Sequence, residues 1–263
     1  MLDFIQFWLE IFKIPALILF IHLNIAFIVA TLRKDNSVAD IAWGLGFIVV
    51  TYTAFLTKGQ VTLREILSLT MVTLWALRLA THIYLRGRGR DEDFRYKKWR
   101  EQWGEKALVY SYFQVFILQG FLLLVIATPL LLIHSTSGRS FWISDLLGLI
   151  IWVVGFSFES LADWQLYKFK KDPDNKGKLL TTGLWKYSRH PNYFGEVLLW
   201  WGVFLLALAH PYGLVSIIGP LAITILILKV SGIPLLEKKM EGNAEFEEYK
   251  KKTSVFVPLP PKD

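Results

Sequence analysis

The sequence predicts an all-α protein that crosses a membrane about seven times. Hydrophobic residues make up 54% of the 263 residues and charged residues only 19%, whereas about a quarter of a soluble domain is charged. The charged residues are clustered between long apolar runs, most of which match the roughly 20 residues that a helix needs to cross about 30 Å of hydrocarbon. The expected spans lie near residues 14–32, 38–57, 65–85, 109–133, 142–162, 193–209 and 212–231.

The first span is expected to stay in the mature protein. Asp3 and Glu10 precede the first apolar run, whereas a cleavable signal peptide begins with positive charge. The chain contains no cysteine, which excludes disulfides, thiolate metal sites and thiol nucleophiles.

The net charge of +7 follows the loops in a pattern typical of membrane proteins. Alternate loops hold most of the 29 Lys and Arg residues, while the opposite side holds only Lys13, Lys58, Arg64 and Arg139. Because positive loops stay in the cytoplasm, we expect the N-terminus outside and the C-terminus in the cytoplasm. The basic character therefore gives no reason to expect a nucleic-acid partner.

Three polar segments interrupt the helices, all on the predicted cytoplasmic side. Residues 86–106 mix both charge signs with aromatic residues and predict an interfacial helix. Residues 167–190 contain turn signals, and the tail from Leu236 predicts a polar helix followed by an extended, proline-rich end. With no internal repeat and no long linker, we expect one membrane domain over residues 1–263.

The stretch GLWKYSRHPNYFGEVLLWWG, residues 183–202, joins a basic cluster directly to an apolar segment. If a helix begins at Pro191, which the first turn tolerates, then Arg189, Tyr193, Glu196 and Trp200 share one face. A helix N-terminus with an arginine beside it suits a phosphate or a carboxylate. The alternative is a structural Arg189–Glu196 pair, which leaves His190 and Asn192 unexplained.

The preceding helix carries Glu159 and Asp163, four residues apart on one face. Like charges at this spacing repel each other, so each needs a partner or a proton. One of them can pair with Arg189 or a loop lysine, and the other can hold the hydroxyls of a ribose. A functional role is favoured for the deeper Glu159, whereas Asp163 suits a structural or a functional role equally well.

Charged residues also occur in the second and third helices. Arg78, His82 and Arg86 repeat every four residues, which predicts a charged lining, although a single arginine near a helix end is common. Asp40, at the start of the second helix, is either part of a site or a charge favoured by the helix dipole.

Several other kinds of site are excluded by their missing motifs. The sequence has no metal-ligand spacing, no GxSxG, no GxGxxG and no Walker loop. A dinucleotide would therefore not be held by a Rossmann fold. His22, His134 and His210 are isolated and are assigned no role.

The block RHPNYFGE followed by Trp200 resembles the C-terminal half of membrane steroid 5α-reductases, and Δ14 sterol reductases carry a similar block. The stretches LRLATHIYLRGRGRDEDFRY, ESLADWQLYKF and SGIPLLEKKM are similar to an uncharacterised bacterial branch of that superfamily. The resemblance covers most of the chain, is strongest from about Glu159 onward, and implies a cofactor-binding half over residues 140–263.

The resemblance implies a seven-helix reductase that takes NADPH from the cytoplasm and delivers hydride to an activated C=C bond of a lipophilic, steroid- or isoprenoid-like substrate. It implies a bacterial inner-membrane enzyme whose partners are the bilayer and the substrate, with no nucleic acid and no obligate protein partner. The candidate cofactor-binding residues are Asp163, Arg189, His190, Asn192, Tyr193, Glu196, Glu237 and Tyr249. The catalytic candidates are Tyr84, Tyr96 and Glu159, and the Gln-Glu pair with which steroid reductases engage the substrate carbonyl is not found.

Two other functions stay open at the level of sequence. Membrane methyltransferases of the isoprenylcysteine and phospholipid type carry a similar Arg-His-Pro-x-Tyr-x-Gly block for S-adenosylmethionine, and methyl transfer needs alignment but no hydride. Asn192 within its motif and the charge-rich segment 86–106 favour the reductase. A non-catalytic lipid-binding or scaffolding protein is the third possibility.

Overall fold

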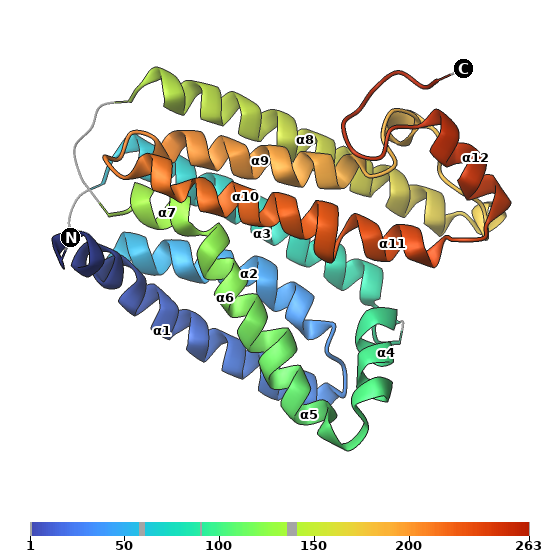
Figure 1. Ribbon diagram of the computed structural model, residues 1–263, viewed down its shortest axis with the longest axis horizontal. Coiled ribbons are helices and arrows are strands. Elements are labelled where there is room, and N and C mark those ends of the chain that lie inside the picture. Colours follow the sequence, from blue (N-terminus) through green and yellow to red (C-terminus); the bar gives the residue numbers. More distant parts are fainter. Residues whose placement is uncertain (1, 58–60, 90, 136–140, 263) are drawn as a thin grey trace. The chain divides into compact units, whose positions relative to one another are not determined.

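The chain folds into helices along almost its whole length (Figure 1). The computed structural model describes residues 2–57, 61–89, 91–135 and 141–262, and among these no strand occurs beyond a single bridge between Ser188 and Ser254. Lys58 and Arg139, on which the orientation argument draws, lie outside the described residues.

Within the described ranges, six helical runs are long and apolar enough to cross a membrane, which confirms the predicted all-α, polytopic class. They are α1 (Leu2–Arg33), α2 (Val38–Leu56), α3 (Leu63–Gly87), the run Phe94–Ile126, α8 (Ile143–Lys171) and the run Gly213–Lys239. The sixth expected span corresponds to α9 (Pro191–Ala207), whose 17 residues extend only about 25 Å at 1.5 Å per residue. The count of seven and the orientation stay predictions.

The run from Phe94 to Ile126 combines several helical types. It consists of α4 (Phe94–Trp103), the 3₁₀ turn η1 (Gly104–Lys106), α5 (Ala107–Tyr110), the π-helical η2 (Ser111–Ile117) and α6 (Leu118–Ile126), and α7 (Thr128–Ile133) follows. Asp93 caps α4 by accepting a hydrogen bond from the Arg95 backbone N–H at 3.0 Å. The helix expected within residues 86–106 is therefore present as α4.

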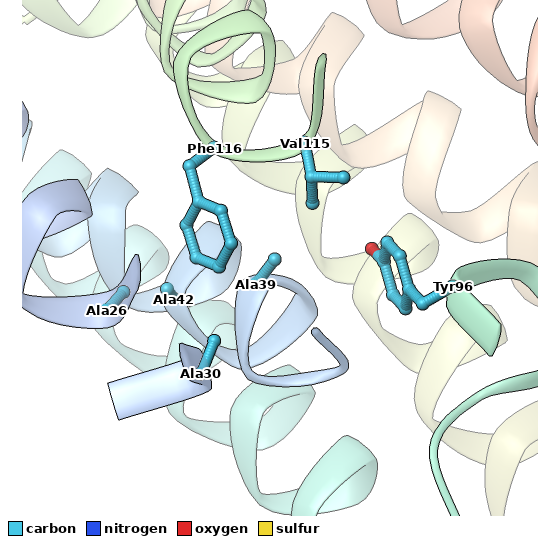
Figure 2. Packing of buried hydrophobic residues seen from close by; sticks show 7 residues of the cluster. All are labelled: Ala26, Ala30, Ala39, Ala42, Tyr96, Val115 and Phe116. Carbon is cyan, nitrogen blue, oxygen red and sulfur yellow. The ribbon is translucent and has the colours of Figure 1, made fainter. Parts of the chain in front are cut away.

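The chain divides into two compact units, and each is described by itself. Unit 1 comprises Met1–Trp142 and Leu206–Gly219, including the 3₁₀ turn η5 (Gly213–Ile217). Its helices α1 and α2 meet through small residues, which let two helix backbones approach closely. Figure 2 shows this cluster, which consists of Ala26, Ala30, Ala39, Ala42, Tyr96, Val115 and Phe116.

Unit 2 comprises Ile143–Leu205 and Pro220–Asp263. In it α8 and α9 are in backbone contact, because a Cβ atom on Gly195 would lie 2.4 Å from the Glu159 nitrogen and one on Gly155 would lie 2.5 Å from the Leu199 nitrogen. Only glycine fits such a crossing. The crossing fixes the position of the Glu159 backbone beside Gly195, in the first turns of α9.

The other elements that lie wholly or largely in unit 2 are short. They are the 3₁₀ turns η3 (Pro173–Asn175) and η4 (Gly183–Lys186), α10 (Ile218–Ile225), the π-helical η6 (Leu226–Val230), α11 (Ile233–Lys239) and α12 (Ala244–Lys252). The tail expected as one polar helix is two, because the chain turns at Gly242, where φ is +83° and glycine is favoured. Asn243 then caps α12 by accepting from the Phe246 N–H at 3.1 Å.

Candidate functional site

The start of α9 is formed as the sequence predicts, with Pro191 as the first helical residue. Ser188 precedes it and is fully buried. Its hydroxyl oxygen accepts from the His190 N–H at 3.1 Å and its proton is donated to the Phe256 carbonyl at 2.8 Å. Ser188 thus joins the loop before α9 both to the His190 backbone and to the chain near Phe256.

A partly buried ion-pair cluster lies beside this loop. Arg189 Nε donates to Glu237 Oε1 at 2.8 Å, and His190 Nε2 lies 3.2 Å from the same oxygen. The Arg189 side chain is only 9% exposed, and its Nη1 also donates to the Thr253 carbonyl at 2.6 Å. The His190 ring stacks on Tyr193 at 5.7 Å with an interplanar angle of 14°. Glu237 is therefore the carboxylate that orients both basic side chains.

The extended tail after α12 forms a strap over the same loop. The Arg189 N–H donates to the Ser254 carbonyl at 2.8 Å, and the Leu259 N–H donates to the Tyr187 carbonyl at 3.0 Å. Tyr249 donates its hydroxyl to the Trp185 carbonyl. Burial raises the pKa of the Tyr249 phenol, so this side chain is a neutral hydrogen-bond donor at physiological pH.

Helix α8 brings two buried acids to the other side of the α9 start. Glu159 is 2% exposed and Asp163 is 7% exposed. Asn192 Nδ2 donates to Asp163 Oδ1 at 3.1 Å, so an amide from α9 is one partner of Asp163. Gln165 Oε1 accepts from the Leu184 N–H at 3.0 Å and ties α8 to η4.

The eight residues expected to bind a cofactor all belong to unit 2. Direct contacts join Arg189, His190, Tyr193 and Glu237, and a hydrogen bond joins Asp163 to Asn192. Tyr249 joins them through the loop carbonyls, and the half-buried Glu196 follows Gly195 at the α8 crossing. The ion pair of Arg189 with Glu237 was not among the sequence-based alternatives.

The catalytic candidates fall in different units, with Glu159 in unit 2 and both tyrosines in unit 1. Tyr84 is 51% exposed, whereas Tyr96 is 2% exposed. Tyr96 donates its hydroxyl to Asp40 Oδ1 at 2.5 Å and accepts from Gln119 Nε2 at 3.3 Å. In this arrangement the hydroxyl proton of Tyr96 is engaged in the hydrogen bond to Asp40.

Sequence reasoning missed the network around Asp40. Arg95 Nη2 lies 2.7 Å from Asp40 Oδ2, so Asp40 is an ion-pair partner and not only a charge at a helix start. An acid inside an apolar span was the available signal, but nothing local reveals a partner 55 positions away. The lining expected from Arg78, His82 and Arg86 does not extend to Arg86, which is exposed.

The arrangement in unit 2 suits a ligand that carries both anionic and hydroxyl groups. Arg189 Nη2 donates to no described residue, so it retains N–H groups for an anion near the α9 N-terminus. The buried carboxylates of α8 are acceptors for hydroxyl or amide protons. No group of three or more His, Asp or Glu side chains that could hold a metal ion occurs within the described residues.

Comparison with known proteins identifies one matching family and several relatives that are similar over part of their length. The model of a family described as a protein of unknown function, DUF1295, matches residues 26–253. An uncharacterized protein of Schizosaccharomyces pombe is 28% identical over 224 residues, which is 74% of this chain and 64% of that protein. None of the solved structures matches the chain.

Two shorter matches carry functional names. A steroid 5-alpha-reductase of Gossypium hirsutum is 42% identical over 62 residues, 24% of each chain. A probable O-methyltransferase of Ustilaginoidea virens is 48% identical over 46 residues, 18% of this chain and 16% of that one. This chain thus spans 64% or less of the length of these relatives. Because the family model covers most of the sequence, the chain belongs to the DUF1295 family.

Proposed function

We propose that this chain is a membrane oxidoreductase that transfers hydride from NADPH to an activated C=C bond of a lipophilic, steroid- or isoprenoid-like substrate. The observation that carries the proposal is that two pairs, Arg189 with Glu237 and Asn192 with Asp163, bring α11 and α8 to the start of α9. The short similarity to a steroid 5-alpha-reductase supports the same class.

The residues of unit 2 fit a dinucleotide phosphate in their charges and hydrogen-bonding groups. Arg189 Nη2 and the α9 N-terminus would bind a phosphate, and Asp163 would accept protons from ribose hydroxyls. Glu237 orients Arg189, while the strap and Tyr249 hold the loop that presents it. Bound NADPH would supply the hydride, and the protein would supply position and a dry surrounding.

Hydride attack on an enone builds negative charge on the carbonyl oxygen, so a proton donor is required there. Glu159, Tyr84 and Tyr96 are the candidates. Tyr96 can donate to a substrate only if its hydroxyl turns away from Asp40 or a second proton reaches that pair. The Asp40→Asn variant tests this requirement, because a neutral amide would accept the Tyr96 hydroxyl proton more weakly than the carboxylate does.

The test is ligand binding to the purified protein in detergent, measured by the shift in unfolding temperature. NADPH at about 100 times its Kd should raise the free energy of unfolding by about 2.7 kcal/mol. Asp163→Asn should weaken binding, whereas the matched Asp172→Asn should not, because Asp172 only caps the exposed turn η3. Oxidation of NADPH by added enones would then establish turnover.

The second candidate function is methyl transfer from S-adenosylmethionine. The similarity to a probable O-methyltransferase favours it, since identity there reaches 48%. S-adenosylmethionine and NADH belong in the same thermal-shift series. Stabilisation by S-adenosylmethionine with no response to NADPH would replace the reductase with this second function.

A further inference from the structure

Unit 1 contains a cavity whose lining includes none of the residues assigned a role above. Its volume is about 80 Å³, and its lining includes Phe27, Asn36, Arg100, Leu108 and Ser111. That volume is several times the 10–15 Å³ or so that one water molecule requires. Leu108 is 55% exposed, so one wall of the cavity reaches the protein surface.

Three of the four polar lining residues, Asn36, Arg100 and Ser111, belong to one hydrogen-bonded network, and the fourth, Thr31, donates to the Phe27 carbonyl at 2.8 Å. Arg100 binds Glu92 through two hydrogen bonds, Nη2 to Oε1 at 2.6 Å and Nε to Oε2 at 3.2 Å. The Asn36 N–H also donates to Glu92 Oε1 at 2.8 Å, and Asn36 Nδ2 donates to Ser111 Oγ at 2.8 Å. Asn36 and Ser111 are each 4% exposed. Asn36 and Ser111 are therefore held in fixed positions, whereas the Arg100 side chain is 35% exposed.

The network leaves hydrogen-bonding capacity at the cavity. Asn36 Oδ1 accepts no hydrogen bond from the described residues, and the Ser111 hydroxyl accepts one but donates none to them. Arg100 Nη1 likewise donates to no described residue. One acceptor and two donors thus remain beside the apolar Phe27 and Leu108. A ligand that both donates and accepts would pair with these groups.

The charges favour a neutral ligand. Glu92 compensates the charge of Arg100 at hydrogen-bond distance, and a bare amide oxygen at Asn36 would repel a carboxylate or phosphate. A hydroxyl group can donate to Asn36 while it accepts from Ser111 or Arg100. We propose that this cavity binds a neutral lipid alcohol, with its hydroxyl at Asn36 and Ser111 and its hydrocarbon against Phe27 and Leu108.

Photoaffinity labelling of the purified protein with a long-chain alcohol that carries a diazirine tests this proposal. The label should map to peptides that contain residues 27–36 or 100–111. Unlabelled dodecanol should compete at a concentration at least about tenfold lower than dodecanoate, because only the alcohol both donates and accepts. Equal competition by dodecanoate, or a label that maps elsewhere, would refute a site for neutral alcohols.

Variants separate the site from general membrane affinity. Asn36→Leu and Ser111→Ala should each weaken competition by dodecanol about fivefold, as the loss of one hydrogen bond implies. Ser157→Ala is the matched control, since Ser157 is exposed on α8 and donates only to the Val153 carbonyl of its own helix. Ala107→Phe fills the cavity without removing a polar group, and it decides the matter if Asn36→Leu fails to fold. Unchanged labelling in Ala107→Phe would contradict the proposal whatever the other variants do.

Discussion

Removing the Glu237 carboxylate should destabilise unit 2 strongly, because it leaves Arg189 buried with its charge uncompensated. Breaking a buried ion pair costs about 3–5 kcal/mol. Glu237 is 19% exposed, and Arg189 keeps the Thr253 carbonyl at 2.6 Å, so we expect about 2–3 kcal/mol for Glu237→Ala. Glu237→Gln should cost less, about 1–2 kcal/mol, because an amide oxygen still accepts from Nε.

Thermal unfolding of the purified protein in detergent measures this effect. A loss of 2–3 kcal/mol corresponds to a Tm about 6 °C lower for a chain of this size. Glu247→Ala is the control, because Glu247 pairs with Lys250 at 3.4 Å on the exposed face of α12 and such pairs contribute little. If Glu237→Ala melts within about 1 °C of the parent, or no lower than Glu247→Ala, the pair of Arg189 with Glu237 does not stabilise unit 2 as argued.

The remaining predictions concern the helix crossing and the response to acid. Gly195→Ala should lower the Tm by several degrees, since its Cβ atom would lie 2.4 Å from the Glu159 nitrogen. Gly87→Ala is the control and should leave the Tm unchanged, since nothing lies within 4 Å of a Cβ atom there. An unchanged Tm in Gly195→Ala would mean that the helix crossing is looser than described. Burial raises the pKa of Asp93, but the hydrogen bond and charge of Arg95 outweigh it and hold that pKa below its ordinary 3.8. The stability that Asp93 contributes is therefore complete above that value and lost as the pH falls through the lower pKa of the folded state. Unfolding temperatures measured between about pH 6 and about pH 3 should thus fall less steeply for Asp93→Asn than for the parent, and identical slopes would exclude this role.

Much of the fold could be predicted from the sequence, because membrane helices are specified locally. An apolar run of about 20 residues forms a helix whatever its neighbours do, since every backbone group must be satisfied within the segment. The start of α9 at Pro191 and the presence of α4 followed from similarly local signals. The first helix begins earlier than expected, at Leu2, because Pro15 and the charges of its first turns lie inside it without ending it.

The candidate site could be predicted only as a set of residue types. Arg189 and Glu237 were both singled out, yet their pairing was not, because the expected partner of Arg189 was seven positions away and the observed one is 48 away. Asp40 and Tyr96 were likewise singled out without their hydrogen bond, and Arg95, the ion-pair partner of Asp40, was not singled out. The cavity near Asn36 gave no sequence signal, since asparagine and serine are common in loops and at helix ends.

The glycine crossing of α8 and α9 has a consequence for binding thermodynamics. Two backbones in direct contact cannot slide without a clash, so the acids of α8 and the first turn of α9 are fixed before any ligand arrives. A ligand held there would spend little of its binding energy on ordering the protein. Its affinity would then depend mainly on the contacts that it makes with Asp163 and Arg189.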